Sequence, residues 1–521
     1  MRNWHSLFEI FLYPIRILIL GFFLLGVGNI LTNPAFSSLF RVSGDFVVMA
    51  AGVCSRTGSF LVVNFPLFFM LRLVARKGGS AATVVSALAG YVTFLVVTMY
   101  AAPSTFPQSA YSSILGLSMS TVNPLTLSSS VHYPLQTGLV GALLTGFLTL
   151  WRYSRSRGHS EYSLFGFIDR DVWCVITTIF WCGISSRLLV EVWPYILQGL
   201  SICVSFIASD TANPVNLGLY GTLDRFLSTL NLGTLIRTPF WYGSSGGSWI
   251  SMGGASIAGD VNIWTAQVEA NSISGMTGRF ITPYYVLNLF AVPGMLLAVG
   301  QIQTDRLERR RYRGLIVFMI LISLFTGTLL PLEIGMLFLS PLLYLMHLGM
   351  TAILFGVLSA MRIYLGFQCS TNLTMTALPG TLLEYITYFQ SSALRSSAMR
   401  LLVVGAIYFV IYYAMTQLYF RHLAIDIFHT GGQERLVNAT IEAVGGVGNI
   451  KLVHSSFNRL VIGLYEPQKI DVNKLREAGA IRIVESKAGF SISFGAASTM
   501  IRTGIQTRQR QSIRDMDGDG Q

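Results

Sequence analysis

The sequence predicts a polytopic α-helical membrane domain followed by a small α+β domain. Of the 521 residues, 52% are hydrophobic and only 12% are charged. The mean hydropathy is +0.57, which is too apolar for a soluble chain of this length. From residue 433 onward, the charge density rises and the apolar runs shorten, so a second domain of a different class is predicted there.

The membrane domain is predicted from apolar runs that approach the roughly 20 residues needed to span a bilayer as a helix. These runs cover residues 13–31, 81–102, 135–151, 172–207, 284–300, 314–330, 341–361 and 401–419. Because some of them can be split or re-entrant, we expect about eight to ten transmembrane helices. No convincing small-residue cleavage site follows the first run, so it is predicted to be a spanning helix and not a signal peptide.

The net charge of +12 is explained by membrane topology. Clusters of Arg and Lys lie within residues 72–77, 152–157 and 306–313, whereas residues 103–134 contain neither. The positive-inside rule places the three clusters in the cytoplasm and residues 103–134 outside. We therefore expect a multi-pass protein with its N-terminus and C-terminal domain in the cytoplasm, and no nucleic-acid partner. A lipid-headgroup site at residues 306–313 is a less favoured alternative.

Cysteine usage and the acidic C-terminal residues predict no metal site or other cofactor. Cys54, Cys174, Cys182, Cys203 and Cys369 lie in or beside apolar segments without metal-ligand spacing, so they are interpreted as small packing residues. Residues 515–520 resemble the opening of a calcium loop, but they lack the glutamate that such a loop needs at its twelfth position. Residues 506–521 are predicted to be disordered.

The expected domain order is a membrane domain over residues 1–425, a linker over 426–432 and an α+β domain over 433–505. In the last of these, residue patterns predict helices over 434–444 and 472–478 and a strand over 460–464. Residues 481–485 and 490–494 alternate as a hairpin around 487–489, and a final helix begins near residue 496. About 70 residues suffice for one compact core.

Residues 240–259 are rich in Gly and Ser and include Trp241, Tyr242 and Trp249. The spacing matches neither a P-loop nor a dinucleotide-binding loop. Aromatic rings beside small polar residues are suited to stacking on a sugar. Irregular backbone buried between helices has the same composition, and this structural alternative is favoured over the ligand-binding one.

Several motifs occur in the order found in one known family. Residues 327–334 read G-T-L-L-P-L-E-I, and residues 339–347 read L-S-P-L-L-Y-L-M-H. The family patterns are G-x-T-E-P-L-E-F and F-x-A-P-x-L-Y-x-x-H. Residues 292–294 and 221–225 fit L-P-G and G-x-x-E-R, and residues 441–450 fit the L-x-A-L-G-G-x-x-N-I opening of a small cytoplasmic domain.

Nearly the whole chain therefore resembles an enzyme IIC (EIIC) fused to an enzyme IIB (EIIB) of the bacterial phosphotransferase system, in the glucose, maltose and N-acetylglucosamine superfamily. The resemblance implies a sugar permease in the bacterial inner membrane that forms a homodimer. It also implies a sugar or glycoside ligand and an EIIA-like or regulatory protein partner. The C-terminal α+β domain would then be EIIB-like.

The resemblance fails at the residue that would carry phosphate. Residues 454–460 read H-S-S-F-N-R-L where EIIB domains have D-x-C-x-T-R-L-R. Ser456 stands at the phosphocysteine position, and an aliphatic hydroxyl needs an adjacent base before it attacks. Val461 replaces the second arginine, whereas Arg459 is retained. No catalytic residue of the family is therefore intact.

The substrate-binding candidates implied by the resemblance are Arg225, Gly233, Thr234, Leu330 and Glu333. Leu330 replaces the first glutamate of T-E-P-x-E, and an unpaired sugar hydroxyl would cost roughly 1–3 kcal/mol. Gly233 and Thr234 replace two histidines, whose imidazoles would orient or deprotonate a hydroxyl. Arg225 and Glu333 are retained. An alternative role for Glu333 is that of a helix-break carboxylate bonded to backbone amides.

Three functions are compatible with this pattern. We favour a pseudo-permease that binds a ligand or a regulatory partner without normal phosphotransfer. A second hypothesis is a sugar or glycoside transporter that works by facilitated exchange or with an EIIB supplied in trans. The third is an atypical sugar phosphotransferase that uses Ser456 or another residue in place of cysteine. Enzymatic activity is left open, with an inactive protein expected.

Overall fold

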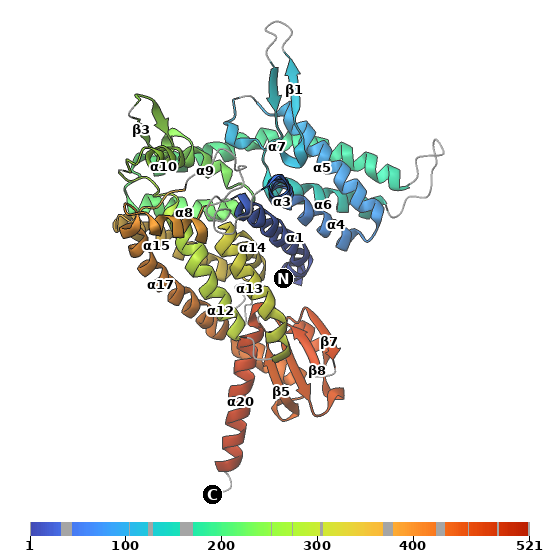
Figure 1. Ribbon diagram of the computed structural model, residues 1–521. Helices are drawn as coiled ribbons and strands as arrows, with labels where there is room; N and C mark the ends of the chain where they lie inside the picture. The colour runs from blue at the N-terminus through green and yellow to red at the C-terminus, as the bar shows by residue number, and fades with distance from the viewer. Residues whose placement is uncertain are drawn as a thin grey trace.

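The computed structural model has a helical membrane domain with a smaller α+β unit at one end (Figure 1). The structure describes residues 2–32, 44–103, 105–122, 129–156, 170–251, 253–273, 275–302, 306–367, 379–423, 433–456, 458–486 and 489–518.

The first half of the membrane domain is a set of long helices. They are α1 (Arg2–Thr32), α3 (Asp45–Val63), α4 (Phe65–Gly78), α5 (Ala81–Ala101), α6 (Gly138–Ser156) and α7 (Arg170–Ser209). Helices α1 and α3 approach closely, since a Cβ on Gly58 would lie 2.5 Å from the amide nitrogen of Leu25. Between α5 and α6, β1 (Met119–Val122) and β2 (Ser129–His132) form an antiparallel hairpin that projects from the domain (Figure 1).

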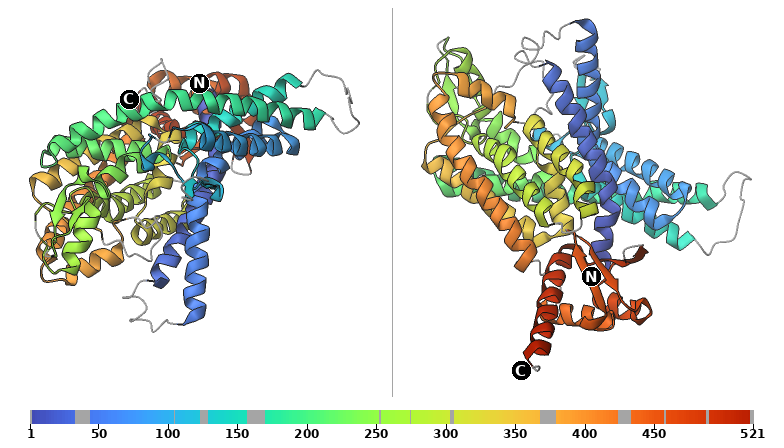
Figure 2. Two further views of the ribbon diagram at one scale, coloured as in Figure 1. Left: turned by 90° about the horizontal axis from the view of Figure 1, so that it is seen from above. Right: turned by 60° about the horizontal axis from the view of Figure 1, so that its bottom comes forward.

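The second half contains shorter helices around the largest apolar core. Its elements are α8 (Pro214–Thr229), α9 (Thr234–Trp241), β3 (Ser248–Ile250), β4 (Ser256–Ala258), α10 (Asp260–Glu269), α11 (Thr282–Val286), the π-helix η4 (Leu287–Ala291), α12 (Val292–Ile302), α13 (Arg306–Thr326), α14 (Leu330–Leu339), α15 (Pro341–Ala360), α16 (Leu382–Gln390), α17 (Arg395–Leu418) and the π-helix η5 (Tyr419–Leu423). Figure 2 shows these elements beside the N-terminal helices.

Glycines let α8 pack tightly against α15, which positions the polar residues farther along α8. A Cβ on Gly218 would lie 3.0 Å from the carbonyl oxygen of Ala352. A Cβ on Gly221 would lie only 2.3 Å from Cδ2 of Phe355. Small residues permit such close backbone approach between membrane helices.

Seven helices among the described residues are long and apolar enough to cross a bilayer. They cover Ile10–Leu31, Asp45–Val63, Ala81–Ala101, Asp171–Ser209, Thr282–Ile302, Pro341–Ala360 and Arg395–Arg421. The expected polytopic membrane fold is confirmed, although this count is below the eight to ten helices predicted. The span at Asp45–Val63 was missed, and the predicted run at 314–330 corresponds to a shorter apolar helix, Tyr312–Thr326. Arginines near the end of α6 make its sequence less apolar than the run at 135–151 suggested.

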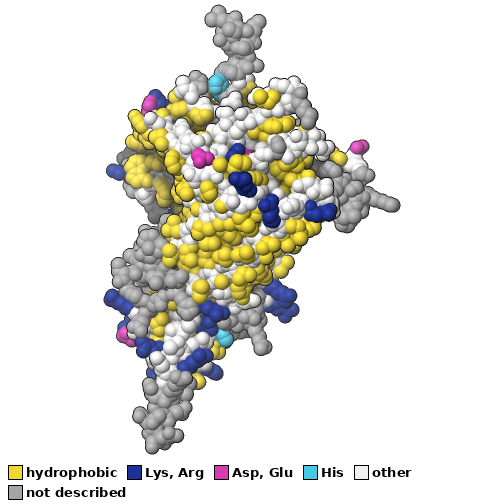
Figure 3. Space-filling view, turned by 90° about the vertical axis from the view of Figure 1, so that its left-hand side faces the viewer, with side chains coloured by type: hydrophobic (Ala, Val, Ile, Leu, Met, Phe, Trp, Pro, Cys, Tyr) yellow, Lys and Arg dark blue, Asp and Glu magenta, His cyan; other side chains and the backbone are white. Residues whose placement is uncertain are grey.

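The outer face of the second half carries a broad apolar band (Figure 3). On α17, the exposed apolar side chains are those of Met399, Leu402, Val403, Ile407, Val410 and Leu418. Lys and Arg side chains gather below the band in this view. An apolar belt bordered by cations is the surface expected of a protein embedded in a bilayer.

The C-terminal unit contains a four-stranded antiparallel sheet in the order β5-β6-β8-β7. Its elements are α18 (Gln433–Ala443), β5 (Ile450–Ser455), β6 (Leu460–Leu464), α19 (Val472–Glu477), β7 (Arg482–Ser486), β8 (Gly489–Ser493) and α20 (Ser498–Gly518). The sheet and the three helices share one apolar core. In the pairing register, Ser455 lies opposite Leu460, so the chain reverses between β5 and β6.

Two features of this unit differ from the sequence predictions. Strand β5 was not predicted, and α20 continues to Gly518 where residues 506–521 were expected to be disordered. The first two turns of α20 are anchored by the buried residues Ile501 and Ile505, which lie one turn apart. Neither Gly nor Pro occurs in residues 505–517, so the helix can continue. The predicted linker at 426–432 and Cys369 lie outside the described residues.

Candidate functional site

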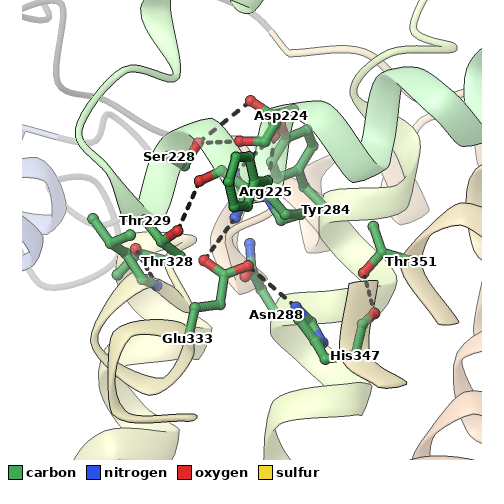
Figure 4. Close-up of polar contacts among 12 residues, drawn as sticks. Asp224, Arg225, Ser228, Thr229, Tyr284, Asn288, Thr328, Glu333, His347 and Thr351 are labelled. Carbon is green, nitrogen blue, oxygen red and sulfur yellow. Dashed lines mark hydrogen bonds and ion pairs between the residues drawn. The ribbon is translucent and has the colours of Figure 1, made fainter. Parts of the chain in front are cut away.

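A buried cluster of charged residues lies where α8, α14 and α15 meet (Figure 4). Helix α8 contributes Asp224 and Arg225, α14 contributes Glu333 and α15 contributes His347. Asp224 and Glu333 are each 0% exposed, and Arg225 is 4% exposed. Ionisable residues inside a membrane domain are costly, so such a cluster is a default candidate for a functional site.

Arg225 joins the two sequence motifs that were proposed to bind substrate. Its NH1 lies 3.6 Å from Oε2 of Glu333, which makes an ion pair longer than a hydrogen bond. Its Nε and NH2 donate to Oδ2 of Asp224 at 3.0 and 2.9 Å. The guanidinium carbon also lies 4.9 Å from the centre of the Tyr284 ring. The arginine is therefore held mainly by Asp224, which leaves Glu333 less completely paired.

Arg237, on α9, is the second cation of the cluster. Its Nε donates to Oδ1 of Asp224 at 2.6 Å and its NH2 donates to Oγ of Ser228 at 2.8 Å. The Tyr284 hydroxyl donates to Asp224 as well. The cluster thus holds two carboxyl groups, of Asp224 and Glu333, beside the guanidinium groups of Arg225 and Arg237, so opposite charges are present in equal number. Such balance is required for burial, because an unpaired buried charge is strongly destabilising.

Glu333 is also linked to α15 and α17 through His347. The Oε1 of Glu333 lies 3.1 Å from Nε2 of His347, and Nδ1 of His347 lies 2.9 Å from the Tyr412 hydroxyl. No described residue donates a hydrogen bond to Oε2 of Glu333. This oxygen is an available acceptor for a ligand hydroxyl beside the guanidinium of Arg225.

The other candidates in the membrane domain lie around this cluster and not in it. A Cβ on Gly233 would be 2.5 Å from Oγ of Ser228, so this position borders the Arg237 contact. Thr234 donates from Oγ1 to Oε1 of Gln136 at 2.6 Å. Leu330 packs against the apolar cluster formed by α1, α4 and neighbouring helices. Its amide donates to Oγ1 of Thr328 at 3.3 Å.

Among the aromatic residues of 240–259, Trp241 favours the structural alternative. Trp241 is buried and donates from Nε1 to the Tyr220 hydroxyl at 2.8 Å. The Arg237 guanidinium lies over the Trp241 ring, 5.3 Å from its centre. Trp241 therefore packs against Arg237 of the charged cluster, and its indole N–H is hydrogen-bonded to Tyr220.

In the C-terminal unit, Ser456 lies in the turn between β5 and β6. Its amide donates to the carbonyl oxygen of Arg459 at 2.7 Å, and its hydroxyl donates to Oδ1 of Asn458 at 3.4 Å. The residue is only 2% exposed. Within the described part of the chain, no carboxylate or imidazole is hydrogen-bonded to this hydroxyl to act as a base. Arg459 is half-buried.

Asp224, Arg237, His347, Tyr284 and Tyr412 were not proposed as site residues from the sequence. The available signal was an ionisable side chain inside an apolar segment, which marks functional positions in membrane domains. That signal identifies Asp224 and His347, because each sits within a motif, but it does not show that a neighbouring helix supplies Arg237. Across the described residues, no group of three or more His, Cys, Asp or Glu side chains is placed to hold a metal ion.

Comparison with known proteins gives two matches. Residues 8–352 match the family model described as "Phosphotransferase system, EIIC". The chain also aligns with the crystal structure of the transporter ChbC, the IIC component from the N,N'-diacetylchitobiose-specific phosphotransferase system, with a TM-score of 0.32 and 15% identity. That alignment covers 80% of this chain and 94% of the other. It is too distant to transfer the role of any residue.

Proposed function

Because the chain belongs to the EIIC family of the phosphotransferase system, we propose that it is a permease that binds a sugar or glycoside between Arg225 and Glu333. We further propose that it moves this ligand without phosphorylating it. The C-terminal unit is proposed to be EIIB-like, with its phosphotransfer chemistry lost.

The contact between Arg225 and Glu333 carries the proposal for ligand binding. The 3.6 Å separation of NH1 and Oε2 is longer than a hydrogen bond, and Oε2 has no hydrogen-bond partner among the described residues. A sugar hydroxyl can donate to the carboxylate oxygen while another of its oxygens accepts from the guanidinium. Charge-assisted hydrogen bonds of this kind are roughly twice as strong as neutral ones. The rigid support from Asp224 and His347 keeps the two groups in place.

The proposed loss of phosphotransfer rests on Ser456. Its hydroxyl is buried and, among the described residues, donates a hydrogen bond to an amide oxygen, which is too weak a base to activate it. In the membrane domain, Leu330 supplies no polar group to a ligand. These two positions favour transport over a coupled phosphorylation step.

Ligand binding and transport are tested together in two assays. Radiolabelled sugars and glycosides are offered to the purified protein, and their uptake is measured in proteoliposomes that contain no phosphocarrier proteins. We expect saturable binding and equilibration across the membrane, both lost in Glu333→Gln. Binding without uptake would favour the regulatory pseudo-permease, and neither binding nor uptake across the panel would contradict the proposal.

Phosphotransfer is tested separately with radiolabelled phosphate passed from phosphoenolpyruvate through the general carriers and a glucose-type EIIA. The wild-type protein is expected to remain unlabelled. If Ser456→Cys does accept phosphate, the fold is intact and only the nucleophile has been lost. Labelling of the wild type that disappears in Ser456→Ala would instead establish an atypical sugar phosphotransferase.

A further inference from the structure

Two arginines meet where the C-terminal unit contacts the membrane domain. Arg421 lies in η5, at the end of the last candidate span, and Arg502 lies in the second turn of α20. Helix α20 packs against η5, and both ribbon views place the start of α20 beside the end of α17 (Figure 1 and Figure 2). The junction therefore brings two like charges together.

Both arginines are carried by rigid supports. Before Arg421, Tyr419 and Phe420 are buried in the membrane-domain core, and the Tyr419 hydroxyl is hydrogen-bonded to Ser340. On either side of Arg502, Ile501 and Ile505 are buried in the core of the C-terminal unit. Neither backbone can move away without breaking one of these cores, so the two residues stay at the junction. The Arg421 side chain is exposed and Arg502 is half-buried, so the pair can be reached by an ion from solution.

The positive charge at this junction has no counter-ion among the described residues. Neither arginine takes part in the ion pairs of this part of the chain. Arg502 donates from NH1 to Oε1 of Gln506 at 3.1 Å, while its Nε is buried without a hydrogen-bond partner. Burial and the charge of Arg421 lower the pKa of Arg502. A bound anion would remove this repulsion and satisfy the Nε.

We propose that Arg421 and Arg502 form a binding site for a phosphate-bearing anion that bridges the membrane domain and the C-terminal unit. Guanidinium groups bind phosphate through paired, charge-assisted hydrogen bonds. Arg421 ends the span Arg395–Arg421, at the level where phospholipid headgroups lie. The same chemistry is available from a free phosphate ion. This site is separate from the sugar site proposed above and does not depend on it.

The anion is expected to stabilise more than the junction itself. Thr499 lies one turn before Arg502 on α20 and donates from Oγ1 to the carbonyl oxygen of Ser456 at 3.4 Å. Anchoring this part of α20 therefore also holds the turn that contains Ser456. We expect ligand-dependent order at the start of α20 and at Ser456, Asn458 and Arg459.

The test is hydrogen–deuterium exchange of the full chain in lipid nanodiscs. One arm compares phosphatidylcholine with phosphatidylcholine plus phosphatidylglycerol, and the other compares inorganic phosphate with chloride at equal ionic strength in phosphatidylcholine alone. At an anion concentration ten times its Kd, exchange of the α20 amides near Arg502 is expected to slow about 11-fold. A response to lipid alone identifies a headgroup, and a response to inorganic phosphate identifies a soluble ion. No response in either arm overturns the proposal.

Charge-removing variants separate this site from general charge effects. Arg502→Gln and Arg421→Gln each remove the repulsion, so each is expected to protect α20 without any anion and to abolish the anion response. Arg510→Gln is the matched control, because Arg510 is an exposed arginine on the same helix, and its response is expected to equal that of the wild type. A response that persists in both junction variants would refute the proposal.

Discussion

Replacement of Arg237 by Met is expected to destabilise the membrane domain by about 3–5 kcal/mol, the usual cost of breaking a buried ion pair. The substitution keeps a long side chain over Trp241 but removes the hydrogen bonds to Asp224 and Ser228. Asp224 is 0% exposed and would keep only Arg225 as a cation. The buried cluster would then carry an excess negative charge.

Arg187→Met is the matched control for this measurement. Arg187 pairs with Glu191 on α7, but these two side chains are 55% and 62% exposed. An exposed pair of this kind contributes about 0–1 kcal/mol. Both variants are compared with the wild type by reversible unfolding in mixed micelles, monitored by tryptophan fluorescence. The two arginines should therefore differ by several kcal/mol, although each forms one ion pair with a single carboxylate.

A double variant decides whether charge balance is the cause. Arg237→Met combined with Asp224→Asn removes one charge of each sign, so we expect it to be more stable than Arg237→Met alone. A loss below about 1 kcal/mol in Arg237→Met would refute the argument, because that is the range of a solvent-exposed pair. Additive losses in the double variant would refute it equally, since independent sites add and coupled ones do not.

Three further substitutions, the first with a matched control, test other parts of the structure. Gly221→Ala places a Cβ against an aromatic ring on α15 and should cost about 1–3 kcal/mol, whereas Gly349→Ala, with open space around its Cβ, should be nearly neutral in a thermal unfolding assay. Leu330→Glu places a charge in an apolar contact and should lower the stability by about 2.5–3.5 kcal/mol. An unchanged melting temperature would contradict the packing of Leu330 against this apolar cluster. Tyr412→Phe removes the hydroxyl beside His347 and should cost about 0.5–1.5 kcal/mol, with unaltered unfolding as the contrary result.

The sequence identified the parts of the site that lie in recognisable motifs. Arg225 and Glu333 were both proposed, and the structure brings them into contact. Arg237 was missed because one cation in a short helix resembles a topology signal, and its partner on α8 is set by tertiary packing. Gly233 and Thr234 were proposed because they replace two histidines of the family pattern. The loss of those histidines does not indicate which residues Gly233 and Thr234 contact.

The fold was predicted best where residue periodicity was regular. In the C-terminal unit, the alternation over 490–494 matches β8 closely. Strand β5 was missed because polar residues at its end, His454 and Ser455, interrupt the apolar pattern. The span Asp45–Val63 was missed for a similar reason, since Arg56 and several small polar residues break a run that is still apolar on average.

The length of α7 constrains how this protein sits in its membrane. Its 40 residues correspond to about 60 Å of straight α-helix, while the hydrocarbon core is only about 30 Å thick. Fitting the whole rod inside the core would require a tilt of about 60°, beyond the usual range of 0–40°. A crossing by α7 would therefore leave part of the helix outside the hydrocarbon core. The exposed pair Arg187–Glu191 lies near the middle of this helix, where the two charges would have to face water or lipid headgroups. Since only four residues separate the end of α7 from the start of α8, the depth of this crossing would also set the height of Asp224 and Arg225 relative to the lipid.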